Sequence, residues 1–352
     1  MIRNLIRIED VTTQWWDGLY STFCDILEHP NDYVDACRGK VMASLFFEPS
    51  TRTSFSFQSA MQRLGGGVFG FTDPATTSAS KGETLADTIR VVSAYSDAVV
   101  IRSKLEGAAQ AAALYSPVPV VNAGDGGHQH PTQTLTDLAT IAQLRGKIGG
   151  ITIGLCGDLK YGRTVHSLVM ALEKFDNVRF VLITPPELKM PDYMLDHMRR
   201  TGQNFTEVTS LEDTLPELDV LYMTRIQRER FPDYNDYLRL RGVYVLTKDK
   251  LRAAKSDMTI LHPLPRYDEM GYDVDDDPRA KYFDQVRYGM LIRMALLANL
   301  CNQKRETPHS HPLTTNINCT NPICVTSAEP YLPRLLSLEG GQSCGYCDKS
   351  LI

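Results

Sequence analysis

Short apolar runs alternate with segments of helical periodicity in the first part of the chain. Strands are expected at four apolar runs, residues 41–47, 68–71, 98–101 and 118–122. Helices are expected where apolar residues recur at helical spacing, at residues 55–64, 85–95, 108–115 and 132–144. Strands that alternate with helices are typical of a parallel sheet covered by helices.

The same alternation starts again after residues 145–150, where Arg, Lys, Ile and Gly interrupt the pattern. Further strands are expected at 151–156, 179–184, 220–223 and 258–261, and a last strong helix at 286–302. We therefore expect an α/β fold of two doubly wound parallel-sheet domains with an active-site crevice between them, because ligands of such sheets bind outside the carboxyl ends of the strands. The expected domains are 1–146, with helix 286–302 packing back on it, then 147–285, and a small separate unit at 303–352 that is proline-rich and polar.

Composition narrows the classes of protein. The 352 residues suffice for two such domains and an appendage, and 43% hydrophobic with 22% charged residues is ordinary for a globular protein. A net charge of −5 leaves no broad basic surface for nucleic acid or anionic lipid. The first residues carry Arg3, Arg7, Glu9 and Asp10 without a sustained apolar core, so we expect no signal peptide, no membrane span and a cytoplasmic location.

Hydroxyl side chains and one arginine follow the first predicted strand, after the strand-breaking Pro49. They are Ser50, Thr51, Arg52, Thr53 and Ser54. At a helix start, unpaired backbone N–H groups and the helix dipole favour phosphate, and an arginine adds a forked donor. The alternative is that Ser50 only caps the helix.

Three more polar segments lie near predicted strand or helix ends in the first half. Lys81 stands on a polar loop and could reach a phosphate, although a solvated loop lysine is the alternative. Arg102 follows the strand 98–101, where it could instead only end the strand. A glycine-rich loop at 122–127 delivers His130 and Gln133 to a helix start, whereas His128 is expected to be exposed.

In the second half, Arg163 lies in the turn after the strand 151–156, and Arg225 and Gln227 follow the strand 220–223. A dinucleotide site in that first turn is disfavoured because the G-x-G-x-x-G spacing is absent. Two guanidinium groups at adjacent strand ends suggest a small dianionic substrate. In the sequence His-Pro-Leu-Pro-Arg at 262–266, two prolines fix the backbone and leave its carbonyls rigidly presented. The alternative is a rigid turn without a functional role.

Four cysteines near the C-terminus form a C-x4-C and a C-x2-C pair. They are Cys319, Cys324, Cys344 and Cys347. Four thiolates suit a structural zinc ion with no open coordination position, and disulfides are the alternative. A unit this small builds little core, so the metal would supply its folding energy.

These motifs together resemble the catalytic chains of the aspartate carbamoyltransferase family, from near the N-terminus to about residue 302. The most specific matches are residues 50–54, 81–84, 130–133, 158–167 and 262–266. The related ornithine enzymes share the first and third of these but lack the Lys160-Tyr161-Gly162-Arg163 run and carry a cysteine-containing turn at 262–265. The resemblance therefore implies aspartate as the acceptor of the carbamoyl group from carbamoyl phosphate, in an early step of pyrimidine (UMP) synthesis.

The resemblance also implies roles for single residues. Carbamoyl phosphate would bind Ser50, Thr51, Arg52, Thr53, Ser78, Arg102, His130, Gln133, Leu264 and Pro265, the last two through a backbone contact to the carbamoyl amine. Aspartate would bind Lys81, Arg163, Arg225 and Gln227. The catalytic set would be Arg52, Thr53, Lys81, Arg102 and His130. Domain 1–146 would then bind carbamoyl phosphate, domain 147–285 aspartate, and 303–352 zinc.

The resemblance further implies a homotrimer, possibly within a larger assembly, in which Ser78 and Lys81 come from a neighbouring subunit. The loop before Lys81 is one residue shorter than the family pattern, so Ser80 is the alternative to Ser78. The implied reaction is direct attack of the aspartate amine without a covalent enzyme intermediate and without an organic cofactor. We hypothesise that the departing phosphate takes the amine proton, because no carboxylate stands among the motif residues.

Two other functions compete with this one. A different amino acid could accept the carbamoyl group, or the chain could be an inactive scaffold that assembles through its tail. The tail itself resembles the zinc domain of the separate regulatory chain of some bacterial enzymes of this family, here fused to the catalytic chain. The nucleotide-binding domain of that regulatory chain is missing, since residues 303–318 are too few to form it.

Overall fold

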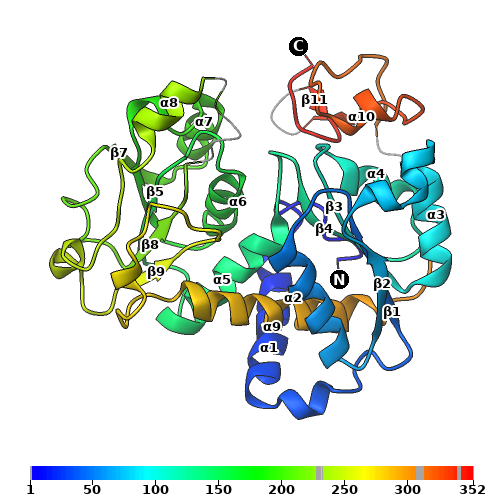
Figure 1. The fold of residues 1–352 in the computed structure, drawn as a ribbon, viewed down its shortest axis with the longest axis horizontal. Coiled ribbons are helices and arrows are strands. Elements are labelled where there is room, and N and C mark those ends of the chain that lie inside the picture. The colour runs from blue at the N-terminus through cyan, green and yellow to red at the C-terminus, as the bar shows by residue number, and fades with distance from the viewer. Residues whose placement is uncertain (1, 227–230, 232, 307–312, 339–341, 352) are drawn as a thin grey trace. The chain divides into compact units, whose positions relative to one another are not determined.

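A computed structural model describes residues 2–226, 231, 233–306, 313–338 and 342–351 (Figure 1). The chain divides into two compact units, Met1–Thr132 with Met290–Ile352, and Gln133–Gly289. Two long helices contain the points of division, α5 (Pro131–Arg145) and α9 (Tyr282–Leu300).

The first unit contains a four-stranded parallel sheet in the order β2-β1-β3-β4. Its strands are β1 (Val41–Phe46), β2 (Gly67–Phe71), β3 (Ala98–Ser103) and β4 (Val120–Asp125). The helices of this unit before α5 are α1 (Thr13–Glu28), α2 (Thr51–Arg63), α3 (Leu85–Tyr95) and α4 (Ala108–Tyr115). Successive residues of β1 and β3 are buried, as in a parallel sheet with helices on both faces.

The second unit contains a five-stranded parallel sheet in the order β7-β6-β5-β8-β9. Its strands are β5 (Thr152–Cys156), β6 (Arg179–Ile183), β7 (Asn204–Val208), β8 (Val220–Met223) and β9 (Thr259–Leu261). Its helices after α5 are α6 (Arg163–Leu172), α7 (Asp192–Arg200) and α8 (Tyr234–Leu240). The two parallel sheets with their helices confirm the predicted α/β class.

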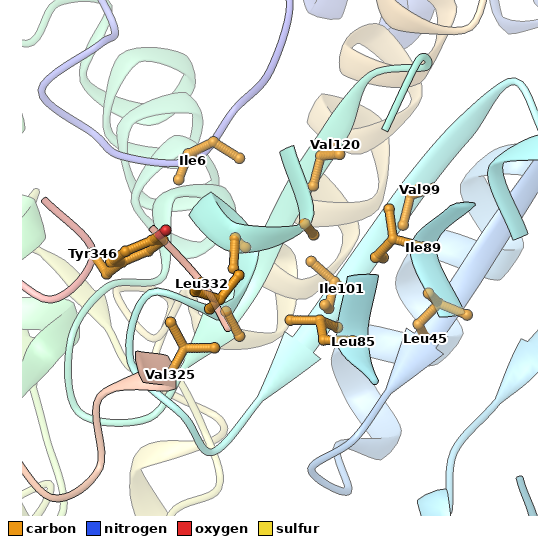
Figure 2. Packing of buried hydrophobic residues seen from close by; sticks show 14 of the residues in the cluster. Ile6, Leu45, Leu85, Ile89, Val99, Ile101, Val120, Val325, Leu332 and Tyr346 are labelled. Carbon is orange, nitrogen blue, oxygen red and sulfur yellow. The ribbon is translucent and has the colours of Figure 1, made fainter. Parts of the chain in front are cut away.

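Within residues 313–338 and 342–351, the cysteine-containing tail has little regular structure of its own. It forms one helical turn, α10 (Val325–Ala328), and a short antiparallel pair, β10 (Leu336–Ser337) with β11 (Ser343–Cys344). Its buried side chains join the core of the first unit: Figure 2 shows Val325, Leu332 and Tyr346 packed in one cluster with Leu85 of α3 and Ile101 of β3. The tail, expected as a separate unit, thus shares a hydrophobic core with the first sheet.

Among the described elements of the two α/β units, helix α1 and strand β7 have no counterpart in the predicted pattern. Helix α1 buries Trp16, Leu19, Phe23 and Ile26, a helical spacing that was present in the sequence, and Thr12 caps it by accepting a hydrogen bond from the Trp15 backbone N–H. Strand β7 is an edge strand whose residues are only partly buried or exposed, so no apolar run marks it. None of the helices in the described ranges is both long and apolar enough to cross a membrane.

Candidate active site

The carboxyl ends of β1, β3 and β4 bring together three of the predicted segments in the first unit. Phe46, at the end of β1, pairs in register with Arg102 of β3. The Phe47 backbone N–H donates to the Arg102 carbonyl at 2.8 Å, and one Arg102 guanidinium nitrogen donates to the Ala123 carbonyl of β4 at 3.1 Å. The turn at 50–53, Arg102 and the loop that leads to His130 therefore lie at one edge of this sheet.

Ser50 occupies the N-cap position of α2 in an extended conformation, but its side chain makes no capping hydrogen bond. The capping alternative therefore does not account for its hydroxyl. Thr51 and Arg52 are exposed in the first turn of the helix, whereas Thr53 is 9% exposed. A helix start with backbone donors, hydroxyls and an exposed guanidinium is suited to an anion.

Arg102 forms an ion pair with Glu48, which lies two residues after the end of β1. Its Nη2 lies 2.8 Å from Oε2 of Glu48, and only 11% of its side chain is exposed. Burial lowers the pKa of Arg102, and the attraction of Glu48 opposes this shift without cancelling it. The buried Nε has no hydrogen-bond partner within the described parts of the chain, so a further donor is available for an oxygen atom.

His130 is 6% exposed and directly precedes α5. Its Nδ1 lies 3.5 Å from the Thr132 hydroxyl. The loop before it is fixed by Asp125, whose carboxylate accepts from the backbone N–H groups of Gln129 at 3.0 Å and Gly107 at 2.8 Å. The fold thus presents His130 from a rigid loop rather than from a flexible one.

The expectation that His128 is exposed is wrong. Only 10% of its side chain is exposed, and its two ring nitrogens lie 2.9 Å from Asp125 and 2.7 Å from Asp348 of the tail. Burial would lower the pKa of His128, but the two carboxylates outweigh this and raise it to about 10. Both ring nitrogens therefore carry protons at neutral pH.

Lys81 and Ser78 lie on the loop between β2 and α3. They are the ends of a 3₁₀ turn, Ser78–Lys81, and both are exposed. Ser80 is exposed as well, and its hydroxyl donates to the Thr77 carbonyl at 2.7 Å. Nothing in these positions favours one serine over the other as a ligand.

In the second unit, Arg163 and Arg225 come from adjacent strand ends. Arg163 is the first residue of α6, after the turn that follows β5, and Arg225 stands two residues after β8. Strands β5 and β8 are hydrogen-bonded neighbours, with Cys156 opposite Met223. Gln227 lies outside the described residues.

The turn that carries Arg163 is packed against the end of β8. Gly157 has a φ of +118°, and a Cβ there would lie 2.3 Å from the Thr224 carbonyl oxygen. Asp158 is buried and accepts from the Tyr161 backbone N–H at 2.9 Å. This close approach requires glycine at 157 and fixes the position of the turn.

The turn at 262–265 follows β9, which neighbours β8. The Leu264 backbone N–H donates to Nδ1 of His262 at 2.8 Å, so the ring proton is on Nε2, 2.7 Å from Glu269. Burial lowers the pKa of His262 and keeps the ring neutral. Leu264 has a φ of +54°, which an ordinary residue adopts only when its surroundings hold it.

Residues that sequence reasoning missed hold these groups in place. Asp137 is buried one helical turn after Gln133 on α5. It accepts hydrogen bonds from Gln133, Gln285 and Tyr222. Arg293, 5% exposed on α9, donates to the Ser56 hydroxyl of α2 at 2.9 Å. A buried charged residue cannot be recognised from one sequence, because a charged position in a helix is normally expected on the surface.

The four tail cysteines converge. The Sγ atoms of Cys319 and Cys347 are 3.5 Å apart, those of Cys324 and Cys344 are 3.9 Å apart, and all four lie within 4.8 Å of one another. Tetrahedral zinc with Zn–S bonds of about 2.3 Å needs sulfurs about 3.8 Å apart. All eight cysteines are free thiols, so the disulfide alternative is not what this fold contains.

Two groups of contacts attach the tail to the first unit. Around α3 and α4, Glu106 pairs in a strand-like bridge with Cys324, the Glu329 carboxylate accepts from the Leu85 N–H at 3.1 Å, and the Tyr331 hydroxyl accepts from the Ala86 N–H at 2.9 Å. At the His130 loop, Asp348 contacts His128 and also Arg7. The tail therefore contacts both the helix that follows the Lys81 loop and the loop that precedes His130.

Comparison with known proteins agrees with this arrangement. Residues 3–143 match the family model of the aspartate/ornithine carbamoyltransferase carbamoyl-P binding domain, and residues 149–300 match that of the Asp/Orn binding domain. The aspartate carbamoyltransferase catalytic subunit of Clostridium novyi (strain NT) is 54% identical over 298 residues, which are 85% of this chain and 97% of that protein.

Solved structures agree as well. The catalytic subunit of M. jannaschii aspartate transcarbamoylase has a TM-score of 0.80 at 47% identity, covering 85% of this chain and 98% of that one. The Trypanosoma cruzi enzyme, solved with carbamoyl phosphate and aspartate, has a TM-score of 0.80 at 38% identity, covering 85% of this chain and 96% of that one.

The two matched models, one for each α/β domain, place the chain among carbamoyltransferase-type proteins. The chain belongs to the aspartate/ornithine carbamoyltransferase family. The cysteine tail lies beyond residue 300, where the second family model ends.

Proposed function

We propose that this chain is an aspartate carbamoyltransferase, which converts carbamoyl phosphate and L-aspartate to N-carbamoyl-L-aspartate and phosphate, an early step of pyrimidine synthesis. The observation that carries the proposal is the placement of Arg163 and Arg225 at the ends of neighbouring strands, which suits an acceptor with two carboxylates. The Clostridium novyi relative is named an aspartate carbamoyltransferase catalytic subunit, and the Trypanosoma cruzi aspartate transcarbamoylase was solved with carbamoyl phosphate and aspartate, which supports the proposal.

Carbamoyl phosphate is assigned to the domain 1–146 with helix 286–302, and aspartate to the domain 147–285. Ser50, Thr51, Arg52 and Thr53 hold the phosphate at the start of α2. Gln133 belongs to the groups around the carbamoyl unit, and the turn at Leu264 and Pro265 contacts the carbamoyl amine through its backbone. Gln227 joins Arg163 and Arg225 in binding aspartate.

The mechanism follows from where charge develops. As the aspartate nitrogen forms a bond to the carbamoyl carbon, the bond from that carbon to the phosphate oxygen breaks. Thr53, Arg102 and His130 stabilise the carbonyl oxygen, while Arg52 and Lys81 stabilise the leaving phosphate. The amine proton passes to the departing phosphate, so no protein nucleophile and no organic cofactor are needed.

The direct test is formation of carbamoyl aspartate by the purified protein from carbamoyl phosphate and aspartate. R163A and R225A should each raise KM for aspartate while leaving KM for carbamoyl phosphate nearly unchanged. Product with ornithine but not with aspartate would support the other acceptor class, and no product with any amino acid would support an inactive scaffold.

We also propose a homotrimer in which Lys81 and Ser78, or Ser80 in its place, enter the site of a neighbouring subunit. The exposure of this loop is compatible with such a role. Two inactive variants, R52A and K81A, should regain activity when unfolded and refolded together in equal amounts, because roughly a quarter of all sites in the closed trimers receive both intact residues. Mixed refolding without any gain in activity would argue that each chain supplies its own lysine.

For the tail at 303–352, we propose a structural zinc ion bound by Cys319, Cys324, Cys344 and Cys347. The sulfur spacing supports this assignment, and zinc bound to four thiolates contributes folding energy rather than catalysis. We further propose that the tail is a fused counterpart of the regulatory-chain zinc domain and braces contacts between catalytic subunits. Free thiols and a thiolate-bound metal suit a reducing compartment, so we assign the protein to the cytoplasm.

A further inference from the structure

A single buried carboxylate is linked by hydrogen bonds to two parts of the proposed carbamoyl site, Gln133 and the turn at Leu264. Asp137 is fully buried on α5, one turn after Gln133. Its Oδ1 accepts from Nε2 of Gln133 at 2.8 Å and from Nε2 of Gln285 at 2.6 Å. Its Oδ2 accepts from the Tyr222 hydroxyl at 2.9 Å.

The contact with Gln133 decides which end of its amide faces away from α5. An ionised carboxylate has no hydrogen to donate, so it pairs only with the NH2 end of a glutamine. Gln133 must therefore turn its Oε1 away from Asp137. An oxygen presented in this way accepts a hydrogen bond from an N–H group but rejects another acceptor.

The contact with Gln285 transmits the same constraint to the turn after β9. Because Nε2 of Gln285 faces Asp137, its Oε1 faces the opposite way and accepts from the His262 backbone N–H at 3.0 Å. His262 in turn accepts from the Leu264 N–H at 2.8 Å through Nδ1. Leu264, with its unfavourable positive φ, is thus held by a chain of hydrogen bonds that begins at Asp137.

We propose that Asp137 is a positioning residue that makes the site specific for a carbamoyl group, by forcing Gln133 to present an acceptor to the carbamoyl NH2. This inference rests on the proposed function. Asp137 does not touch the substrate in this proposal. Through Gln133 it makes the site require an acyl phosphate that carries an N–H donor. An acyl phosphate with a methyl group instead of the amine, such as acetyl phosphate, then leaves the Gln133 oxygen unpaired.

The test is the ratio of kcat/KM for carbamoyl phosphate to that for acetyl phosphate, with aspartate as acceptor. D137A removes both acceptor oxygens and should lower this ratio by at least about tenfold, because Gln133 can then rotate its amide. D137N is the matched variant: its amide oxygen can still accept from Gln133 and Gln285, while the Tyr222 hydroxyl can accept from its NH2 group. D137N should therefore keep the ratio within about threefold.

The behaviour of the two variants tests the role of Asp137. A D137A protein that keeps the wild-type ratio overturns the proposal, and so does a D137N protein with a ratio as low as that of D137A. Should D137A fail to fold, the Gln133 side-chain NH2 of the wild type provides the readout by nitrogen-15 NMR: protection from exchange supports the contact with Asp137, and rapid exchange overturns it. Failure of the wild type to form carbamoyl aspartate would instead count against the proposed function.

Discussion

Asp348, the residue after the last tail cysteine, accepts a hydrogen bond from Nε2 of His128 at 2.7 Å, two positions before His130. The other ring nitrogen of His128 donates to Asp125 at 2.9 Å, and Arg7 donates to the second oxygen of Asp348 at 2.7 Å. The tail is thereby joined to the loop that carries a proposed catalytic residue.

D348N should lower the pKa of His128 and weaken the attachment of the tail. The change removes one of the two carboxylates that raise this pKa to about 10. Since 36% of the Asp348 side chain is exposed, a loss of about 1–2 kcal/mol in the free energy of unfolding is expected. NMR titration of the His128 ring measures the first effect and thermal unfolding the second; an unchanged His128 titration would contradict the contact.

The same ion pair predicts how wild-type stability depends on pH. His128 has a pKa near 6.5 when unfolded and about 10 when folded, so its contribution is complete below pH 6.5 and is lost as the pH rises to about 10. The groups that face it are Asp125, Asp348 and, through Asp348, Arg7. Unfolding of H128Q should lack this alkaline decline, which makes it the matched control.

G107A should destabilise the protein far more than G39A. Both glycines have positive φ, +82° and +74°, so the backbone cost of alanine is similar, about 1 kcal/mol. A Cβ at 39 would have no non-neighbouring atom of the described residues within 4 Å, whereas a Cβ at 107 would lie 2.4 Å from Cβ of Tyr346. The difference in their melting temperatures therefore measures the packing of the tail on α4, and equal melting temperatures would contradict that packing.

Removal of metal should release the tail. C344S, or a chelator on the wild type, is expected to abolish binding of about one zinc ion per chain and to make residues 313–351 sensitive to protease, because the tail has little regular structure of its own. C24S, at a half-buried cysteine of α1 outside the cluster, is the control. Elemental analysis and limited proteolysis are the measurements, and a metal-free wild type would rule out the zinc assignment.

R102A should lower kcat by about a hundredfold, equivalent to about 2.7 kcal/mol of transition-state stabilisation. The side chain is held by Glu48 and the Ala123 carbonyl and still has a buried Nε for a developing negative charge. K104A, at an exposed position two residues later, should leave kcat unchanged. Steady-state kinetics with both substrates measures kcat of the two variants. Equal kcat values would show that Arg102 does not stabilise the transition state.

Much of the fold could be predicted because strands buried on both faces leave continuous apolar runs. The runs at 41–47, 98–101 and 220–223 became β1, β3 and β8 with small differences at their ends. Strand β4 extends to Asp125, past the predicted end at 122, because Asp125 pairs with Ser103 of β3. Helix α9 starts at Tyr282, four residues before the predicted 286, and buries that tyrosine completely.

The candidate site was also predictable only in part. The sequence identified the residues that end strands and start helices, such as Ser50, Arg102, Arg163 and Arg225, because their chemistry and local position suffice to single them out. The residues that hold them were not identifiable. Glu48, Asp137 and Gln285 look like ordinary polar positions until the fold brings them to their partners.

By itself, the sequence determined the α/β class, the family and a set of four cysteines at metal-binding spacing. Only the tertiary structure decided that His128 is enclosed between two carboxylates, that Gly107 must have no side chain, and that one buried aspartate orients two distant elements. The physical reason is the separation along the chain of the residues that determine each property. Apolar periodicity and helix starts are local properties of the chain, whereas burial and hydrogen-bond partners depend on residues as far apart as Gln133 and Gln285, or His128 and Asp348.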